Sequence, residues 1–368
     1  MKVARGELLG LTGLRAWAAL WVVAHHHRIF LDGVLGEYWL SVLVRGYLGV
    51  DLFFTLSGFV LAYNYGGRIR SAADHLRFIL LRIARLYPLH LATLLTVIAV
   101  SQASGLIGLH ISSPYVYVLD HHFFLHLFMI HGWGFESGLR FNRPSWSISA
   151  EFFAYLLFPL AWVVAVRFAR PMAAAATALA VSGVTVLALS ALGHTTLHVA
   201  TQHALVRVSG EFLAGVLVYR CLALGGWLGR EGALGAVPTA IALGCAFALA
   251  ISPWADPWLA PGAALLVTVL ATGRGPAMLA FASRPVVYLG RISYSIYLTH
   301  MLVMAALQRL LPTRHLEDLG GLQVKGVLVI HAVVIVGFAA LSYRWIERPA
   351  RDVLQRWVRR KLPAREGA

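Results

Sequence analysis

The chain has 368 residues, of which 59% are hydrophobic and 13% are charged. A soluble globular domain carries roughly 25% charged residues, so this composition excludes an ordinary soluble protein. The formal net charge is +15, but the basic residues stand between apolar runs and form no basic domain, which excludes nucleic acid as a partner.

The apolar runs are long and continuous. They predict an all-α membrane protein, a polytopic helical bundle, because each crossing of a bilayer needs about 20 apolar residues in a helix. Lys2 and Arg5 precede the first run, but no small-x-small cleavage site follows, so this run is predicted to be a retained span and not a signal peptide. The predicted spans, about ten in all, are 11–30, 41–64, 77–101, 145–166, 172–193, 204–220, 234–252, 258–272, 285–308 and 324–345.

Basic connections predict the orientation, because cytoplasmic loops are enriched in Lys and Arg. With ten spans, the connections around Arg68, Arg167 and Arg274 all fall on one side together with both termini, which are therefore predicted to be cytoplasmic. Segment 102–144 then lies on the outer side. The apolar stretch 122–131 within it is too short to cross, which predicts an interfacial or re-entrant helix.

The chain is predicted to form one transmembrane domain, residues 1–350, followed by a basic tail, residues 351–368. The region from Trp345 onward is amphipathic and basic, so the tail is expected to lie on the cytoplasmic leaflet. Two cysteines in apolar runs indicate neither a disulfide framework nor a metal site, and no metal is expected.

Ionisable residues inside a span are costly and point to function. In the first span, Arg15 and His26 are eleven residues apart, so they share one helix face and lie about 16 Å apart along the axis. An imidazole in line with a guanidinium that holds an anion suits a general base beside a bound donor. The alternative is that His25, His26 and His27 cap the outer interface.

The second span carries Asp51 and Ser57 among aromatic residues. Asp51 is expected either to fix the tautomer of a histidine or to pair with Arg15. Ser57 lacks the strand-to-helix turn of a serine nucleophile and is expected to support the site. Gly49 and Gly58 are predicted to serve close helix packing.

The third span brings Arg77, Arg82 and Arg85 toward one face, with no acid after Asp74 in that segment. Guanidiniums without acid partners bind anions, and either lipid phosphates or a phosphorylated ligand would satisfy them. Pro88 is expected to kink this helix and open a cavity.

The fourth span begins with Trp146 at its outer mouth, followed by Ser147 and Glu151 one turn apart. That spacing allows a hydrogen bond between the two side chains. A carboxylate so deep is kept ionised only by a partner, expected to be an arginine or a histidine, and it suits a structural or substrate-holding function.

Later spans give weaker signals. Arg207 and Glu211 stand at i,i+4 and are predicted to form a structural ion pair. The ninth span carries polar side chains that are expected to support the site, at Arg291, Tyr294 and His300.

Six segments, taken in order, resemble the acyltransferase-3 family of bacterial membrane O-acyltransferases: LTGLRAWAALWVVAHHH, GVDLFFTLSGFVLA, RIARLYP, PSWSISAEFFAYLLFP, LGRISYSIYLTH and WIERPAR. The resemblance covers nearly the whole chain. It implies a ten-span core in the bacterial inner membrane that moves an acyl group, usually acetyl, from cytoplasmic acyl-CoA to a carbohydrate such as a surface polysaccharide, O-antigen or lipid-linked glycan. Membrane lipids, acyl-CoA and the glycan are the implied partners, and no permanently bound cofactor is expected.

The resemblance also implies functions for particular residues. The family's arginine-then-histidine motif maps onto Arg15 and His26, and its arginine-rich motif before a proline maps onto Arg82 and Arg85, with Tyr87 beside them, as donor-binding residues.

The family's SWSxxxE segment maps onto Trp146, Ser147 and Glu151. The chain departs from the family where Phe152 follows Glu151 in place of a second acid or a glutamine. It departs again where Leu81 stands in place of an arginine in the arginine-rich motif.

Together these features predict that His26, oriented by Asp51 or Glu151, removes the proton of an acceptor hydroxyl. Arg15 is expected to stabilise developing negative charge or the donor's phosphates. Direct attack and an acyl-histidine intermediate are both open. A secondary transporter also carries charges at mid-membrane, but the sequence shows no inverted repeat. A non-catalytic protein that binds lipid-linked glycans would consume no thioester.

Overall fold

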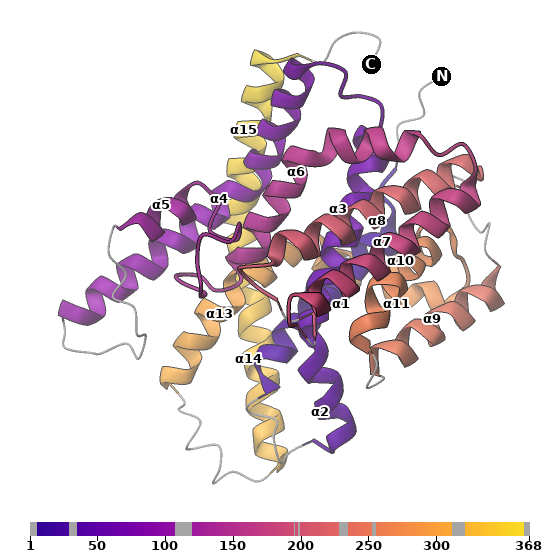
Figure 1. The fold of residues 1–368 in the computed structure, drawn as a ribbon. Helices are drawn as coiled ribbons and strands as arrows, with labels where there is room; N and C mark the ends of the chain where they lie inside the picture. Colours follow the sequence, from indigo (N-terminus) through magenta and orange to yellow (C-terminus); the bar gives the residue numbers. More distant parts are fainter. Residues whose placement is uncertain are drawn as a thin grey trace.

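The computed structural model describes residues 6–28, 35–106, 120–194, 196–197, 199–227, 235–251, 255–310 and 321–363. Within these ranges the protein is built of helices and contains no strand (Figure 1). In chain order the α-helices are α1 (Leu9–His26), α2 (Glu37–Val44), α3 (Gly49–Tyr65), α4 (Ala72–Leu106), α5 (His121–Leu127), α6 (Ser145–Val166), α7 (Pro171–Ala191), α8 (Ala204–Leu224), α9 (Ala236–Ile251), α10 (Ala255–Thr272), α11 (Leu279–Ala282), α12 (Arg284–Arg291), α13 (Ser293–Leu310), α14 (Gly321–Ser342) and α15 (Arg348–Lys361).

The all-α prediction is confirmed, and each predicted span overlaps at least one helix. Five described stretches are long and apolar enough to cross a membrane: Glu37–Tyr65, Ala72–Ser104, Ser145–Val166, Pro171–Ala191 and Gln323–Lys361. Ten crossings and cytoplasmic termini stay predictions.

Two predicted spans are broken where the sequence suggested one helix. The span 41–64 is divided by a 3-10 turn at Arg45–Leu48, and the span 285–308 is divided at Ile292 between α12 and α13. The short α5 has seven residues and rises only about 10 Å, so this segment is too short to cross, as predicted.

The C-terminal region continues the preceding helix. A π-helical turn at Tyr343–Glu347 joins α14 to α15 without a break. In Figure 1, α15 runs beside the first half of α4, where Arg77 donates a hydrogen bond of 2.9 Å to the carbonyl of Leu362. The expected boundary at 351 is therefore not a break in secondary structure, because the helix continues through it and packs on α4.

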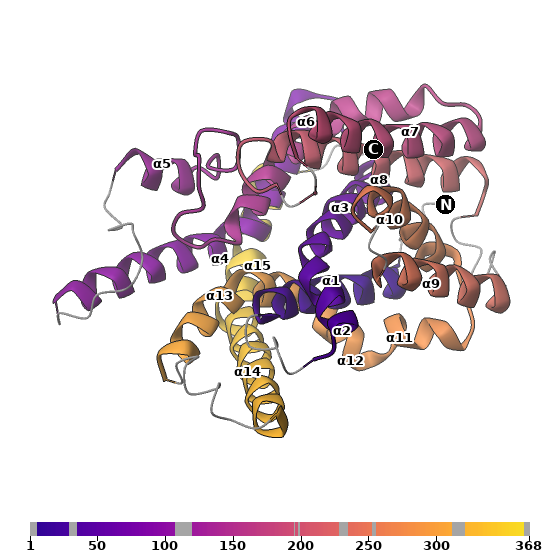
Figure 2. The same cartoon turned by 60° about the horizontal axis from the view of Figure 1, so that its bottom comes forward.

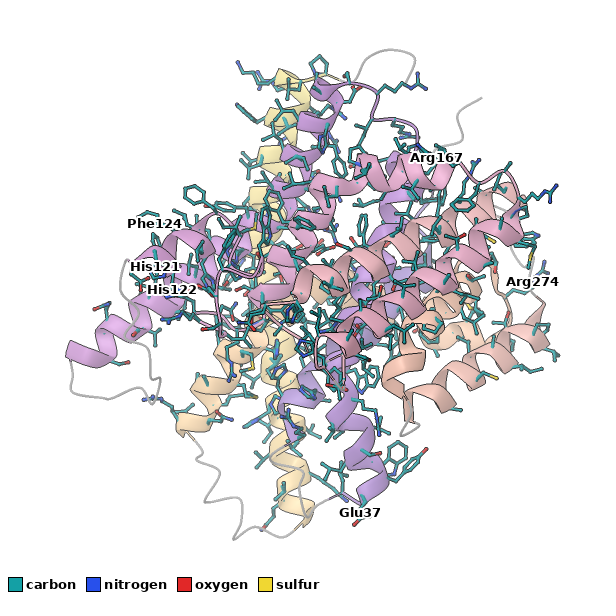
Figure 3. All side chains as sticks on the ribbon, viewed as in Figure 1. Glu37, His121, His122, Phe124, Arg167 and Arg274 are labelled. Carbon is teal, nitrogen blue, oxygen red and sulfur yellow. The ribbon has the colours of Figure 1, made fainter. Side chains whose placement is uncertain are left out.

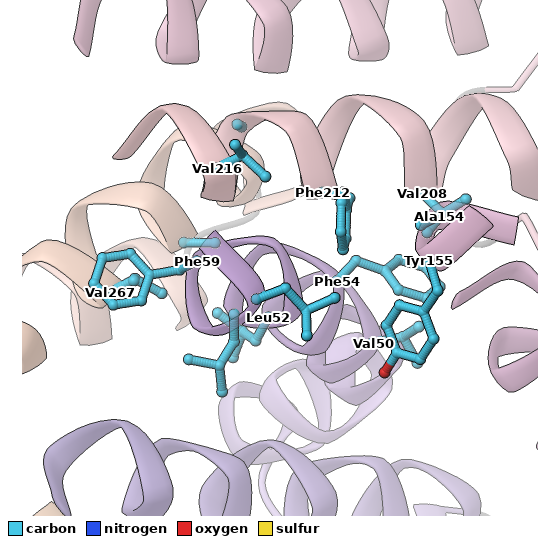
Figure 4. Close-up of a cluster of buried hydrophobic side chains, with 14 of the residues drawn as sticks. Val50, Leu52, Phe54, Phe59, Ala154, Tyr155, Val208, Phe212, Val216 and Val267 are labelled. Carbon is cyan, nitrogen blue, oxygen red and sulfur yellow. The ribbon is translucent and has the colours of Figure 1, made fainter. Parts of the chain in front are cut away.

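The main hydrophobic core surrounds α3, as Figure 4 shows for Phe54 and Phe59 among side chains of α6, α8 and α10. The backbones of α3 and α8 approach closely because both carry glycine at the contact. A Cβ on Gly58 would meet the carbonyl of Phe212, and one on Gly215 would meet the carbonyl of Thr55. The predicted packing use of Gly58 is confirmed.

The helices around this core separate into two groups. Figures 1 and 2 both show α5 and the far end of α4 on one side of the molecule and α9 to α11 on the other. Figure 3 shows Arg167 and Glu37 at opposite ends of the molecule, with His121 and His122 at its edge on α5. The centre, between α1, α3, α4, α6 and α13, holds the candidate site.

Candidate active site

An inner cavity of about 90 Å³ lies at this centre. Arg15 from α1, with Arg82 and Arg85 from α4, lines it together with Glu151 from α6. The other polar side chains on its wall are Ser57, Ser147, Tyr155, Tyr294 and Tyr297. Since three arginines face one carboxylate, the cavity suits an anionic guest.

Two of the three cavity arginines donate hydrogen bonds to neutral hydroxyl groups. Nη2 of Arg82 donates a hydrogen bond of 2.9 Å to the hydroxyl of Tyr65, and the guanidinium lies over that ring at 5.2 Å. Nε of Arg15 donates to the hydroxyl of Ser293 at 3.2 Å. Among the described residues, no hydrogen bond or salt bridge engages the guanidinium of Arg85, which lines the cavity. These arginines are therefore ready to bind an anion.

The carboxylate of Glu151 accepts two hydrogen bonds on one oxygen. Ser57 and Tyr155 each donate to Oε1 at 2.6 Å. The expectation of a hydrogen bond from Ser147 to Glu151 is wrong, because the Ser147 hydroxyl forms a hydrogen bond of 2.7 Å with the hydroxyl of Tyr297. Arg15, which also lines the cavity, attracts this half-buried carboxylate electrostatically and so compensates for part of the hydration it has lost.

A larger space of about 420 Å³, here called the vestibule, adjoins the inner cavity. Arg15, Val60 and Arg85 line both spaces and therefore stand where the two meet. The remaining charged residues of the vestibule are Glu7, Arg291 and Arg351.

A salt bridge joins Glu7 to Arg291 inside the vestibule. Nη2 of Arg291 donates to Oε2 at 2.6 Å and Nε donates to Oε1 at 3.3 Å, and both side chains are about half exposed. The hydrogen bond from Arg291 lowers the pKa of Glu7 below its usual value of 4.5, so this carboxylate is charged at neutral pH. Arg291, expected to support the site, is thus occupied by an acid.

Asp51 has a different partner from those expected. It forms a buried ion pair with Arg207, in which Nε donates to Oδ1 at 2.8 Å and Nη2 donates to Oδ2. The predicted ion pair of Arg207 with Glu211 is confirmed as a second, longer salt bridge of 3.9 Å. Pairing of Asp51 with Arg15 or with a histidine is therefore wrong. The packing of α3 on α8 brings the two side chains together across 156 residues of sequence.

His26 lines neither the inner cavity nor the vestibule. Its Nδ1 lies 2.9 Å from the carbonyl of Val22 and 3.3 Å from Nε2 of His300. The ring of His300 is 6.0 Å from the ring of Tyr297, which lines the inner cavity. The expectation that Arg15 and His26 face one shared cavity is not met, since Tyr297 and His300 stand between the cavity and His26.

The remaining predicted residues are distributed around the site. Tyr294 lines the inner cavity and donates a hydrogen bond of 2.6 Å to the carbonyl of Leu86. Trp146 lies under the guanidinium of Arg207 at 5.5 Å. Tyr87 lines neither space, and its ring lies 6.3 Å from the ring of His90.

Sequence reasoning missed several residues of the site. Tyr155 stands four residues after Glu151, a spacing that places both on one helix face and could have revealed it. Glu347 and Arg351 show the same spacing and form a salt bridge of 3.4 Å. Tyr65, in contrast, gives no sequence signal, because its contact with Arg82 depends on how α3 and α4 pack.

A family model and one relative, among the comparisons with known proteins, name an acyltransferase. The family model described as "Acyltransferase domain" matches residues 8–344. The chain is 31% identical over 337 residues to "Acyltransferase MdmB" of Streptomyces mycarofaciens, covering 83% of this chain and 81% of that protein. It is 41% identical over 85 residues to "Protein 2 in picA locus" of Rhizobium radiobacter, covering 23% of this chain and 40% of that protein. No solved structure matches.

Proposed function

The chain belongs to the acyltransferase-3 family and is an acyltransferase, and from this premise we propose that it moves an acyl group from acyl-CoA to a carbohydrate hydroxyl. The acyl group is acetyl in the simplest form of the proposal, and the acceptor is a cell-surface polysaccharide or a lipid-linked glycan. The protein would span the bacterial inner membrane about ten times, with both termini in the cytoplasm.

One observation carries the proposal: the guanidinium of Arg85 lines both the vestibule and the inner cavity. A phosphorylated donor would place its phosphates in the vestibule, against Arg15 and Arg85, because charge-assisted hydrogen bonds to arginine are strong and specific for phosphate. The much smaller inner cavity would then take the slim thiol arm.

The acyl group would be delivered toward His26. Arg15 and His26 lie about 16 Å apart along α1, and the donor's extended arm would bridge this length. The hydrogen bond between Ser147 and Tyr297 lies on the wall of the inner cavity, and Tyr297 in turn contacts His300. To reach His26, the donor's arm would have to break this hydrogen bond.

In the chemical step, Nε2 of His26 would take the proton of the acceptor hydroxyl while the hydroxyl oxygen attacks the thioester carbonyl. The carbon–sulphur bond then breaks, and the imidazolium returns the proton to the leaving thiolate. General base catalysis supplies about 10²–10⁴-fold, so His26→Ala should lose most turnover and still insert into the membrane.

The test is release of CoA from acetyl-CoA and propionyl-CoA by detergent-solubilised protein, with methyl glycosides of glucose, galactose and mannose as acceptor probes. The proposal expects Arg85→Gln to raise the KM for the donor. A guanidinium–phosphate bond is worth about 1.5–3 kcal/mol, which corresponds to about a tenfold to hundredfold change. Arg77→Gln is the matched control, because Arg77 lies on the same helix and bonds the Leu362 carbonyl.

Two results would overturn the proposal. Wild-type protein that consumes no thioester, with or without the glycosides, would favour a transporter or a glycan-binding protein. An Arg85→Gln variant with the KM of Arg77→Gln would show that the donor's phosphates bind elsewhere.

A further inference from the structure

Two histidines from opposite ends of the chain share a hydrogen bond near the outer end of α1. His26 and His300 are 274 residues apart in sequence, and their ring centroids are 5.0 Å apart. His300 is fully buried, whereas His26 is half-buried. The proposed function assigns a catalytic role to His26 but none to His300.

The neighbouring carbonyls determine which nitrogen of each ring carries the proton. Nδ1 of His300 lies 2.6 Å from the carbonyl of Tyr297. Since a carbonyl oxygen only accepts, Nδ1 of His300 must hold a proton, and in the neutral ring its Nε2 is then an acceptor.

The same argument applies to His26. Its Nδ1 lies 2.9 Å from the carbonyl of Val22 and 3.3 Å from Nε2 of His300. Both neighbours are acceptors, so Nδ1 of His26 carries the proton and shares it between them. Nε2 of His26 is then the bare nitrogen, and within the described part of the chain no hydrogen bond engages it.

We propose that His300 is a positioning residue for His26: Nε2 of His300 accepts from Nδ1–H of His26 together with the carbonyl of Val22, and so leaves Nε2 of His26 free to act as the base. This inference rests on the proposed function. It assigns a task to His300 and identifies the nitrogen of His26 that accepts the proton.

The arrangement stabilises the transition state more than the ground state. When Nε2 of His26 takes up the acceptor's proton, the ring becomes a cation, and its Nδ1–H bond to the neutral His300 becomes charge-assisted. Such bonds are roughly twice as strong as neutral ones. An interaction that strengthens only during the chemical step changes kcat and leaves donor binding unchanged.

The test compares His300→Leu with His300→Gln. Glutamine keeps a carbonyl oxygen near the place of Nε2 and can still accept from His26, whereas leucine cannot. We expect His300→Leu to lower kcat for CoA release by about 10- to 100-fold with an unchanged KM for acetyl-CoA, and His300→Gln to recover most of this loss. The control is His331→Leu, since His331 is also buried and its ring lies against His27, at 5.7 Å.

A second readout does not depend on transfer activity. Diethyl pyrocarbonate acylates the bare nitrogen of a neutral imidazole, and peptide mapping by mass spectrometry measures its rate at His26. The proposal expects similar rates in wild type, His300→Gln and His331→Leu, and a rate several-fold slower in His300→Leu. Size-exclusion profiles and thermal unfolding establish that each variant is folded.

The outcomes separate the two ideas. If wild type releases no CoA but modification of His26 follows the expected order, the proposed function fails and the positioning by His300 stands. If folded His300→Leu keeps the wild-type kcat, or if His300→Gln is as impaired as His300→Leu, the positioning by His300 is overturned.

Discussion

Removal of Arg207 should destabilise the fold strongly, because it leaves Asp51 without its charge partner in the core. Arg207 is 1% exposed and Asp51 is fully buried. Arg207 also donates to the carbonyls of Val199 at 3.1 Å and Tyr47 at 3.4 Å, so it ties α8 to the segments before α3 and α8. Removing one partner of a buried ion pair costs about 3–5 kcal/mol, which is the loss expected for Arg207→Met.

A double-mutant cycle isolates the ion pair. Arg207→Met and Asp51→Leu should each cost about 3–5 kcal/mol, or about 6–10 kcal/mol in sum. The double variant leaves no unpaired charge of this pair and should cost no more than about 3 kcal/mol, from the two carbonyls that lose a donor and from the fully buried Glu211, which loses the guanidinium 3.9 Å away. The expected coupling is therefore at least about 3 kcal/mol.

The assay is reversible unfolding in mixed dodecyl maltoside and SDS micelles, with CoA release measured on the folded fraction. Arg220→Met serves as the control, because Arg220 lies on the same helix and bonds only the carbonyl of Phe168 among the described groups. If the stability loss of the double variant equals the sum of the losses of the two single variants, the reasoning is refuted. A stable Asp51→Leu variant with greatly reduced kcat would also refute it, because that result would show that Asp51 takes part in catalysis.

Three further predictions concern the vestibule, the helix packing and the wall of the inner cavity. Glu7→Gln should lower the KM for acyl-CoA up to about fivefold, since an exposed ion pair is worth about 0–1 kcal/mol and the freed Arg291 can bind phosphate. Because the pKa of Glu7 is lowered, the ion pair's contribution is fully present above about pH 4.5 and is lost only as the pH falls through the lowered value. The gain from Glu7→Gln should thus be constant between about pH 6 and 8, and a gain that varies across this range would contradict the assignment. Gly58→Ala should cost about 1–3 kcal/mol in the same unfolding assay, because its Cβ would meet the Phe212 carbonyl. Gly183→Ala, which meets nothing within 4 Å, should be neutral or slightly stabilising, and equal losses in both variants would argue against close packing at Gly58. Tyr297→Phe removes the bond to Ser147 and should change kcat while the donor KM holds; an effect on KM alone would place Tyr297 in donor binding.

Local sequence patterns were sufficient for the helices and for the arginines of the inner cavity. A run of apolar residues predicts a helix wherever it occurs, because a backbone inside a membrane must satisfy its own hydrogen bonds. Arg82 and Arg85 were identified as anion ligands because the segment offered them no acid, and among the described residues neither forms a hydrogen bond or a salt bridge with an acid.

Partners across the bundle were decided only by tertiary packing. Sequence spacing places a side chain on a face of its own helix, but it does not determine which helix that face meets. Arg207 illustrates this: its spacing predicted the salt bridge to Glu211, which forms at 3.9 Å, but not the shorter contact of 2.8 Å with Asp51, which the packing of α3 on α8 creates.

The same reason explains the largest departure at the candidate site. Arg15 and His26 do share a face of α1 by helical spacing, yet the cavity reaches only Arg15. Tyr297 and His300 arrive from α13, whose approach to α1 is set by packing between segments nearly 300 residues apart. The sequence by itself determined which helices form and where their charges stand along each helix, while only the packed bundle decided which charges meet.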